Sequence, residues 1–274
     1  MALSYRAGRR NFPVPRTVSW LATLFISGFL TLSATPADSA SRTVACTAPR
    51  DMTRLGTALT GFRDRIAAGQ PVTVVALGSS STSGAGASAP QWGYPNRLAA
   101  EFATLFPNAK VRVLNKGVGG ETTRQMVARL DRDVLAHKPD LVIWQAGTNE
   151  LLRREKAADY VQVLRDGIRK LKAAGVDVIL MDAQYAPSVI AQPRYADFVA
   201  GTSLIAKEEG IGLFSRFEIM QHWSQAGGDK APRVLDPDGL HMNDLGYGCI
   251  AHLLATAVAD ALGSQVTRSA LEKR

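Results

Sequence analysis

Apolar residues along the chain fall into two alternating kinds of segment. Short runs rich in β-branched residues predict buried strands, and they lie at residues 71–77, 110–115, 140–146, 176–183 and, more weakly, 211–215. Segments with helical periodicity predict helices, and they lie at residues 53–68, 94–105, 122–136, 157–173, 195–209 and 243–262. Strands that alternate with helices indicate βαβ units and a parallel sheet. We therefore expect an α/β fold, a three-layer α/β/α sandwich with a five-stranded, mainly parallel sheet.

The predicted fold forms one domain, from about residue 45 to residue 265 of the 274-residue chain. This length suits a single α/β domain and is short for two. Hydrophobic residues make up 46% of the chain and charged residues 20%, which is an ordinary balance for a globular protein. Residues 266–274 are expected to form a C-terminal tail.

Residues 1–39 have the pattern of an export signal. Four arginines precede an apolar segment at residues 17–34, and small polar residues follow it. This order is typical of a secretory signal peptide. A retained membrane anchor is the alternative, although the apolar segment is slightly short for a span. We predict export to a periplasmic or secreted location, with membrane contact only through this segment if it is not cleaved.

Charge and cysteine content limit the classes of partner and compartment. The net charge is +8, of which the first 39 residues contribute three charges. The remaining excess forms no Lys/Arg-rich run, so we expect no nucleic-acid partner. The two cysteines, Cys46 and Cys249, can pair in an oxidising compartment. Two unpaired thiols, one of them a buried small hydrophobic residue, are the alternative.

Candidate chemistry follows the predicted strands, where the ligand crevice of an open parallel sheet lies. A serine- and glycine-rich segment that contains Ser80 follows the first strand, a glycine-rich segment that contains Gly120 follows the second, and Asn149 follows the third. Each segment alone is typical of an ordinary turn or helix cap. Their shared position at strand carboxyl ends indicates a common site.

Asp238 and His241 are three residues apart in a short segment before the last predicted helix. A carboxylate in this position can accept the imidazole Nδ1–H and fix the tautomer, which leaves Nε2 free to act as a base. The other three histidines have no acidic residue three positions upstream. The sequence therefore favours His241 as the candidate base.

In these segments the chain resembles the SGNH hydrolases, also called GDSL-type esterases and lipases. The resemblance spans residues 71–262 and rests on four blocks: Gly78-Ser79-Ser80; Asn115 with Gly117 and Gly120-Glu121-Thr122; Gly147-Thr148-Asn149; and Asp238 with His241. It implies the flavodoxin-like fold of that family. Ser79 stands where the family usually has aspartate, which leaves Ser79 and Ser81 as alternatives to Ser80 for the nucleophile.

The resemblance also implies a carboxylic ester hydrolase that needs no metal and no organic cofactor. Ser80 would be the nucleophile, His241 the base and Asp238 the residue that orients and stabilises the imidazolium. The backbone N–H groups of Ser80 and Gly120 and the amide of Asn149 would form the oxyanion hole. The expected substrate is a small-molecule, glycan or lipid ester.

Other classes of protein agree less well with the sequence. A common α/β-hydrolase needs Gly-x-Ser-x-Gly, and Thr82 replaces the final glycine. A glycine-rich match at residues 84–89 lies too far from its strand for dinucleotide binding. Asp236, Asp238 and His241 fit neither an EF-hand nor a zinc spacing. An acyltransferase that keeps water from its acyl-enzyme, or a non-catalytic carbohydrate-binding member of the fold, remains open.

Overall fold

The computed structural model describes residues 47–227 and 233–263. The predicted signal segment, the C-terminal tail and Cys46 lie outside the described residues. Cys249 is fully buried. Because Cys46 is outside the described residues, the pairing of the two cysteines stays a prediction.

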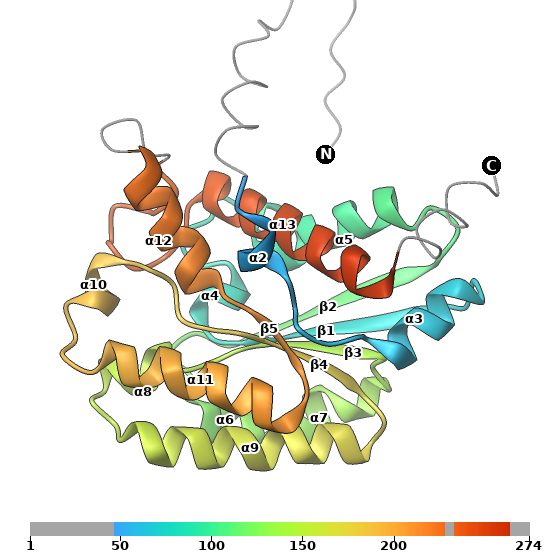
Figure 1. The fold of residues 1–274 in the computed structure, drawn as a ribbon, viewed down its shortest axis with the longest axis horizontal. Coiled ribbons are helices and arrows are strands. Elements are labelled where there is room, and N and C mark those ends of the chain that lie inside the picture. The colour runs from blue at the N-terminus through green and yellow to red at the C-terminus, as the bar shows by residue number, and fades with distance from the viewer. Residues whose placement is uncertain (1–46, 228–232, 264–274) are drawn as a thin grey trace, which may run out of the picture. The chain divides into compact units, whose positions relative to one another are not determined.

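The centre of the fold is a sheet of five strands in the order β2-β1-β3-β4-β5, with every neighbouring pair parallel (Figure 1). The strands are β1 (Val72–Gly78), β2 (Val111–Gly117), β3 (Leu141–Gln145), β4 (Asp177–Met181) and β5 (Gly212–Phe214). β1 has β2 on one side and β3 on the other, so the connections diverge at its carboxyl end. Such a topological switch point is where open α/β sheets bind ligands. The predicted fold class is confirmed.

Helices cover both faces of the sheet, as Figure 1 shows. One face carries α2 (Arg50–Thr53), α3 (Thr60–Ala67), α5 (Tyr94–Leu105), α12 (Arg216–Gly227) and α13 (Asp244–Leu262). The other carries α6 (Thr123–Ala128), α7 (Leu130–Asp133), α9 (Ala157–Ala173) and α11 (Tyr195–Glu209). Short helices follow three strands: α4 (Ser80–Ser83), α8 (Thr148–Leu152) and α10 (Pro187–Ile190). Two single 3-10 turns, η1 (Pro90–Trp92) and η2 (Leu135–His137), complete the described elements.

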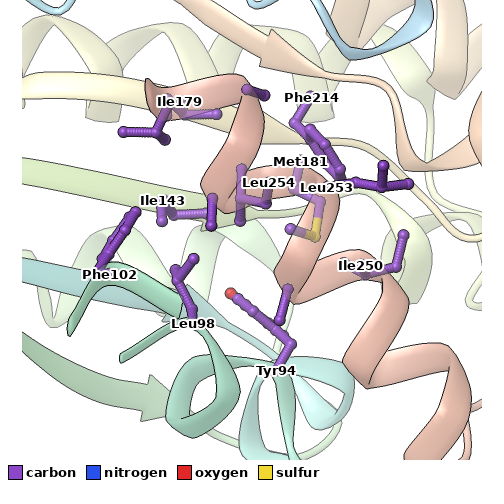
Figure 2. Packing of buried hydrophobic residues seen from close by; sticks show 14 of the residues in the cluster. Tyr94, Leu98, Phe102, Ile143, Ile179, Met181, Phe214, Ile250, Leu253 and Leu254 are labelled. Atoms are coloured by element: carbon purple, nitrogen blue, oxygen red, sulfur yellow. The ribbon is translucent and has the colours of Figure 1, made fainter. Parts of the chain in front are cut away.

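The core against the first face is built where α5 and α13 pack on the strands (Figure 2). Tyr94, Leu98 and Phe102 of α5 are fully buried. They face apolar residues of α13 and of the central strands, including Ile143, Ile179, Met181, Phe214, Ile250 and Leu254. Burial of such a side chain contributes about 1.5–3 kcal/mol. Among the described residues α13 is the one helix long and apolar enough to span a membrane, and most of it is buried inside the domain.

Two helix predictions were wrong in detail, and one long helix was missed. The segment at residues 53–68 is helical only over α3, because α2 ends at Thr53 and the chain between the two helices turns at Gly56, whose φ is +75°. The segment at residues 122–136 is divided into α6, α7 and η2, and Arg129 joins the first two. α12 was not expected. It begins where the Phe217 N–H donates to Asp182 Oδ1 (2.9 Å), a residue 35 positions earlier in the chain, so no local signal marks its start.

Candidate active site

The chain turns sharply after β1 and places Ser80 at the start of α4. A Cβ on Gly78 would lie 2.1 Å from Thr82 Oγ1, so only glycine permits this close approach. Ser79 is buried, and both its N–H and its hydroxyl donate to Gln145 Oε1 of β3, each over 3.2 Å. The residue that replaces the family's usual aspartate thus points into the fold, and Ser80 is left at the carboxyl edge of the sheet.

Ser80, His241 and Asp238 form one continuous chain of hydrogen bonds. His241 Nε2 lies 2.7 Å from Ser80 Oγ, and His241 Nδ1 lies 2.5 Å from Asp238 Oδ2. Burial opposes ionisation of Asp238, but hydrogen bonds from the His241 ring and from the Leu240 and His241 N–H groups hold the pKa of its carboxyl below the usual value. An ionised carboxylate, an imidazole and a hydroxyl in this order are the groups of a serine hydrolase triad.

His241 and Asp238 lie on a short loop, residues 235–242, here called the His241 loop. Its ends are joined by an isolated antiparallel bridge between Leu235 and Met242. Within it, Asp238 Oδ1 accepts the N–H groups of Leu240 (2.9 Å) and His241 (2.8 Å). These are local contacts over two or three residues, so the spacing seen in the sequence is enough to bring the carboxylate to the imidazole.

The His241 loop is tied to neighbouring segments on two sides. Gln184, after β4, donates to the Leu240 carbonyl over 3.1 Å, and the Ser188 N–H of α10 donates to the Gly239 carbonyl over 3.1 Å. On the other side the chain after α4 passes so closely that a Cβ on Gly86 would lie 2.9 Å from His241 Cβ. The backbone that carries the imidazole is therefore in contact both with the segment after β4 and with the segment after α4.

The segment after β2 makes a turn over residues 118–121, here called the Gly120 turn. It is closed by the Glu121 N–H, which donates to the Val118 carbonyl over 3.3 Å. Gly120 has φ +76°, in the left-handed region that glycine adopts without strain. Within residues 47–227 and 233–263, the backbone N–H groups of Gly120 and of Ser80 donate to no protein acceptor, so both are open to a ligand atom.

Asn149 lies in the first turn of α8 and faces the Gly120 turn. Its Nδ2 donates to the Glu121 carbonyl over 2.7 Å. The cap position of α8 is taken by Gly147, so Asn149 does not cap that helix. One amide hydrogen holds the turn, and the amide nitrogen carries a second that can donate elsewhere. Arg153, at the end of α8, donates to the Gly120 carbonyl over 2.7 Å.

Several buried polar residues around these segments were not found by sequence reasoning. Arg216 is fully buried and donates to the Asp182 carbonyl (2.8 Å) and to Gln184 Oε1 (2.8 Å). Burial raises the pKa of the Asp182 carboxyl to about 7, against the opposing effects of the Phe217 N–H and the Arg216 charge. Arg129, Gln145 and Glu150 are also buried polar residues next to the site. No fixed spacing links any of them to Ser80 or His241, so the sequence carries no signal for them.

Comparison with known proteins gives the family of the chain. Residues 45–264 match the family model described as the Non-GDSL lipase-like family, and the chain belongs to that family.

Three similar proteins illustrate the relationship. The chain is 32% identical to an acetylxylan esterase of Geobacillus stearothermophilus over 103 residues, which is 34% of this chain and 47% of that protein. It is 30% identical to an arylesterase of Vibrio mimicus over 170 residues, 60% of this chain and 80% of the relative. A solved two-domain esterase active on acetylated mannans superimposes with a TM-score of 0.62 at 22% identity, over 76% of this chain and 56% of its own. The chain thus spans about half the length of the first and third of these proteins.

Proposed function

We propose that the protein hydrolyses carboxylic esters, with Ser80 as nucleophile, His241 as general base and then acid, and Asp238 as the residue that orients the imidazole. The observation that carries the proposal is the unbroken hydrogen-bond chain from Asp238 through His241 to Ser80 Oγ. Bonds of 2.5–2.7 Å are within the reach that proton transfer requires. Membership of a family whose named relatives include esterases supports the same reaction.

The first half of the reaction acylates the enzyme. His241 Nε2 takes the proton of Ser80 as Oγ bonds to the ester carbonyl carbon, and the carbonyl electron pair moves onto oxygen. Asp238 stabilises the imidazolium that forms. The tetrahedral intermediate then collapses, the C–O bond to the leaving alcohol breaks, and His241 returns the proton to that alcohol. A water molecule, activated by the same imidazole, releases the acid in the second half.

The developing oxyanion is proposed to bind between three donors. The N–H groups of Ser80 and Gly120 are open, and the Asn149 amide lies against the Gly120 turn. Donors fixed in advance at the place where negative charge develops are usually the largest single contribution to such a reaction. The Gly120 turn and α8 hold them in position before substrate arrives.

The names of the relatives guide the choice of substrate. One relative is an acetylxylan esterase, another an arylesterase, and a structural neighbour acts on acetylated mannans. Acetyl esters of glycans and aryl esters are therefore the substrates we propose to test before long-chain lipid esters. We also propose that the protein is exported, because residues 1–39 have the order of a secretory signal peptide.

The test is hydrolysis of p-nitrophenyl acetate, butyrate and octanoate by the mature protein and by Ser80→Ala. We expect Ser80→Ala to lose activity by about 10⁴-fold or more, while Ser203→Ala, an exposed serine of α11, keeps it. Ser79→Ala should also remain active, because the Ser79 hydroxyl bonds Gln145 and not His241. Equal activity in wild type and Ser80→Ala would remove Ser80 as the nucleophile. Acetylated xylan and mannan are assayed in parallel, so a narrow substrate range does not hide the activity.

A further inference from the structure

Arg129 is a buried cation next to the proposed site, and the reaction described above does not use it. Only 6% of its side chain is exposed. It stands between the short helices α6 and α7, on the face of the sheet opposite α5 and α13. Withdrawing a guanidinium from water is costly unless its donors are all satisfied. The hydrogen-bond partners of Arg129 therefore indicate its role.

The guanidinium donates to both strands that flank the site. Nη2 donates to the Lys116 carbonyl of β2 over 2.8 Å and, more weakly, to the Gly78 carbonyl of β1 over 3.4 Å. Gly78 is the last residue of β1 and precedes Ser80 by two positions. Arg129 thus connects the end of the strand that carries the nucleophile to the end of the strand that leads into the Gly120 turn.

A third contact reaches the Gly120 turn itself. Arg129 Nε donates to Glu121 Oε2 over 2.7 Å, and Glu121 is the residue directly after Gly120. Nη1 lies 3.3 Å from Asp133 Oδ2 on α7. A planar guanidinium can make these bonds together in fixed directions, which a lysine ammonium on its flexible stem cannot.

The Gly120 turn needs support from outside because it has little of its own. Gly119 and Gly120 are exposed and have no side chains, and a Cβ added at either would touch nothing within 4 Å. Glycine has the largest conformational freedom to lose on ordering. An oxyanion donor is effective only if its position relative to the nucleophile is fixed in advance.

We propose that Arg129 is a positioning residue that sets the distance between the Ser80 nucleophile and the Gly120 oxyanion donor through its bonds to Gly78, Lys116 and Glu121. This inference rests on the proposed ester hydrolysis at Ser80. It assigns Arg129 no contact with the substrate. Its loss should lower kcat, because the transition state is stabilised less, and leave KM nearly unchanged.

The experiment compares Arg129→Met, Arg129→Lys and Glu121→Gln with a matched control, Arg132→Met. Arg132 is 78% exposed on α7 and pairs with the same Asp133, so its loss removes a charge and leaves the strand ends untouched. kcat and KM for p-nitrophenyl acetate and the thermal unfolding midpoint are measured for each. We expect a kcat about 10²-fold lower in Arg129→Met, since displacement of a reacting group by about 1 Å costs that much. Arg129→Lys and Glu121→Gln should show smaller losses of the same kind, and Arg132→Met none.

A second readout separates positioning from general stability. In Arg129→Ala, added guanidinium ion at concentrations that leave the wild type folded should restore part of kcat without raising the unfolding midpoint in proportion. A kcat within twofold of wild type in Arg129→Met, or a loss confined to KM or to the unfolding midpoint, would overturn the proposal. If Arg129→Met does not fold, Arg129→Lys and Glu121→Gln are judged by the same criteria. Ser80→Ala in the same assay shows whether the proposed reaction itself has failed.

Discussion

The His241 loop bonds Ser80 and the Gly120 turn bonds Gly78 at the end of β1, but the two are held by different kinds of contact. The His241 loop is closed by its own backbone and by Asp238, which accepts N–H groups two and three residues further on. The Gly120 turn has one internal hydrogen bond of 3.3 Å. Its other supports come from residues 8 to 40 positions away, including Arg129, Asn149, Arg153 and the Gly78 carbonyl, which accepts the Val118 N–H over 3.0 Å. The proposed base is thus positioned locally, and the proposed oxyanion donor depends on the surrounding fold.

The largest expected effect concerns the His241 loop, which is held by local contacts. His241→Ala should lower kcat for p-nitrophenyl acetate by about 10⁴-fold or more, because no base remains for Ser80. The unfolding midpoint should change little, because the loop is closed by backbone contacts that the ring does not make. His252→Ala is the control, since His252 is 52% exposed on α13 and pairs with Glu101. Activity within tenfold of wild type in His241→Ala would contradict the assignment.

The second largest expected effect concerns the support that the Gly120 turn receives from Asn149 on α8. Asn149→Ala removes a proposed oxyanion donor and also the bond that holds the Glu121 carbonyl. We expect kcat to fall by about 10²–10³-fold, as for other donors of this kind. Asn149→Asp keeps the shape but adds a negative charge near the oxyanion, so it should be at least as damaging. If Asn149→Ala retains a third of the wild-type kcat, Asn149 is not a donor.

Two glycine substitutions compare a glycine that packs against α4, Gly117, with an exposed glycine of the Gly120 turn, Gly119. A Cβ on Gly117 would lie 2.2 Å from the Ser83 nitrogen, whereas one on Gly119 would meet nothing within 4 Å. Gly117→Ala should destabilise the protein by about 1–3 kcal/mol because the backbone must move, which lowers the unfolding midpoint by several degrees. Gly119→Ala should change stability by less than about 0.5 kcal/mol. Thermal unfolding measures both, and equal midpoints would show that β2 and α4 are not in close contact.

The smallest expected effect concerns Arg153. Its guanidinium is exposed and, within residues 47–227 and 233–263, bonds only the Gly120 carbonyl, over 2.7 Å. An exposed hydrogen bond of this type contributes about 0.5–1 kcal/mol, so Arg153→Gln should lower kcat about two- to fivefold. Arg154→Gln, at the next exposed position, is the control. A loss as large as that of Arg129→Met would mean that the turn is held mainly from α8.

The same difference explains what the sequence could predict. Strands were found from apolar runs, and long helices such as α9 and α11 from their periodicity, because these signals are local. Asp238 and His241 were linked by a spacing of three residues, which is how the His241 loop holds them. The order of strands and the short helices follow from tertiary packing, which a periodic pattern does not encode.

The supports of the Gly120 turn could not be predicted. Arg129 appears in the sequence as one charge within an amphipathic segment, next to the exposed Arg132. Nothing local distinguishes the buried arginine from the exposed one. Only the fold brings Gly78 and Lys116, which are 38 positions apart, to the same guanidinium. Residues that bond segments so far apart in the sequence can be identified only when the pairing of the strands is known.

The hydrogen bond between Ser80 and His241 joins residues 161 positions apart, and this has a consequence for the order of events during synthesis. A nascent chain that has emerged through β5 holds all five strands of the described sheet, the proposed nucleophile and all three proposed oxyanion donors, but it still lacks the proposed base. If Ser80 and His241 act as proposed, catalysis can begin only after the His241 loop has left the ribosome. Hydrolytic activity would therefore report, during synthesis or refolding, the arrival of the last segment of the domain and not the assembly of its sheet.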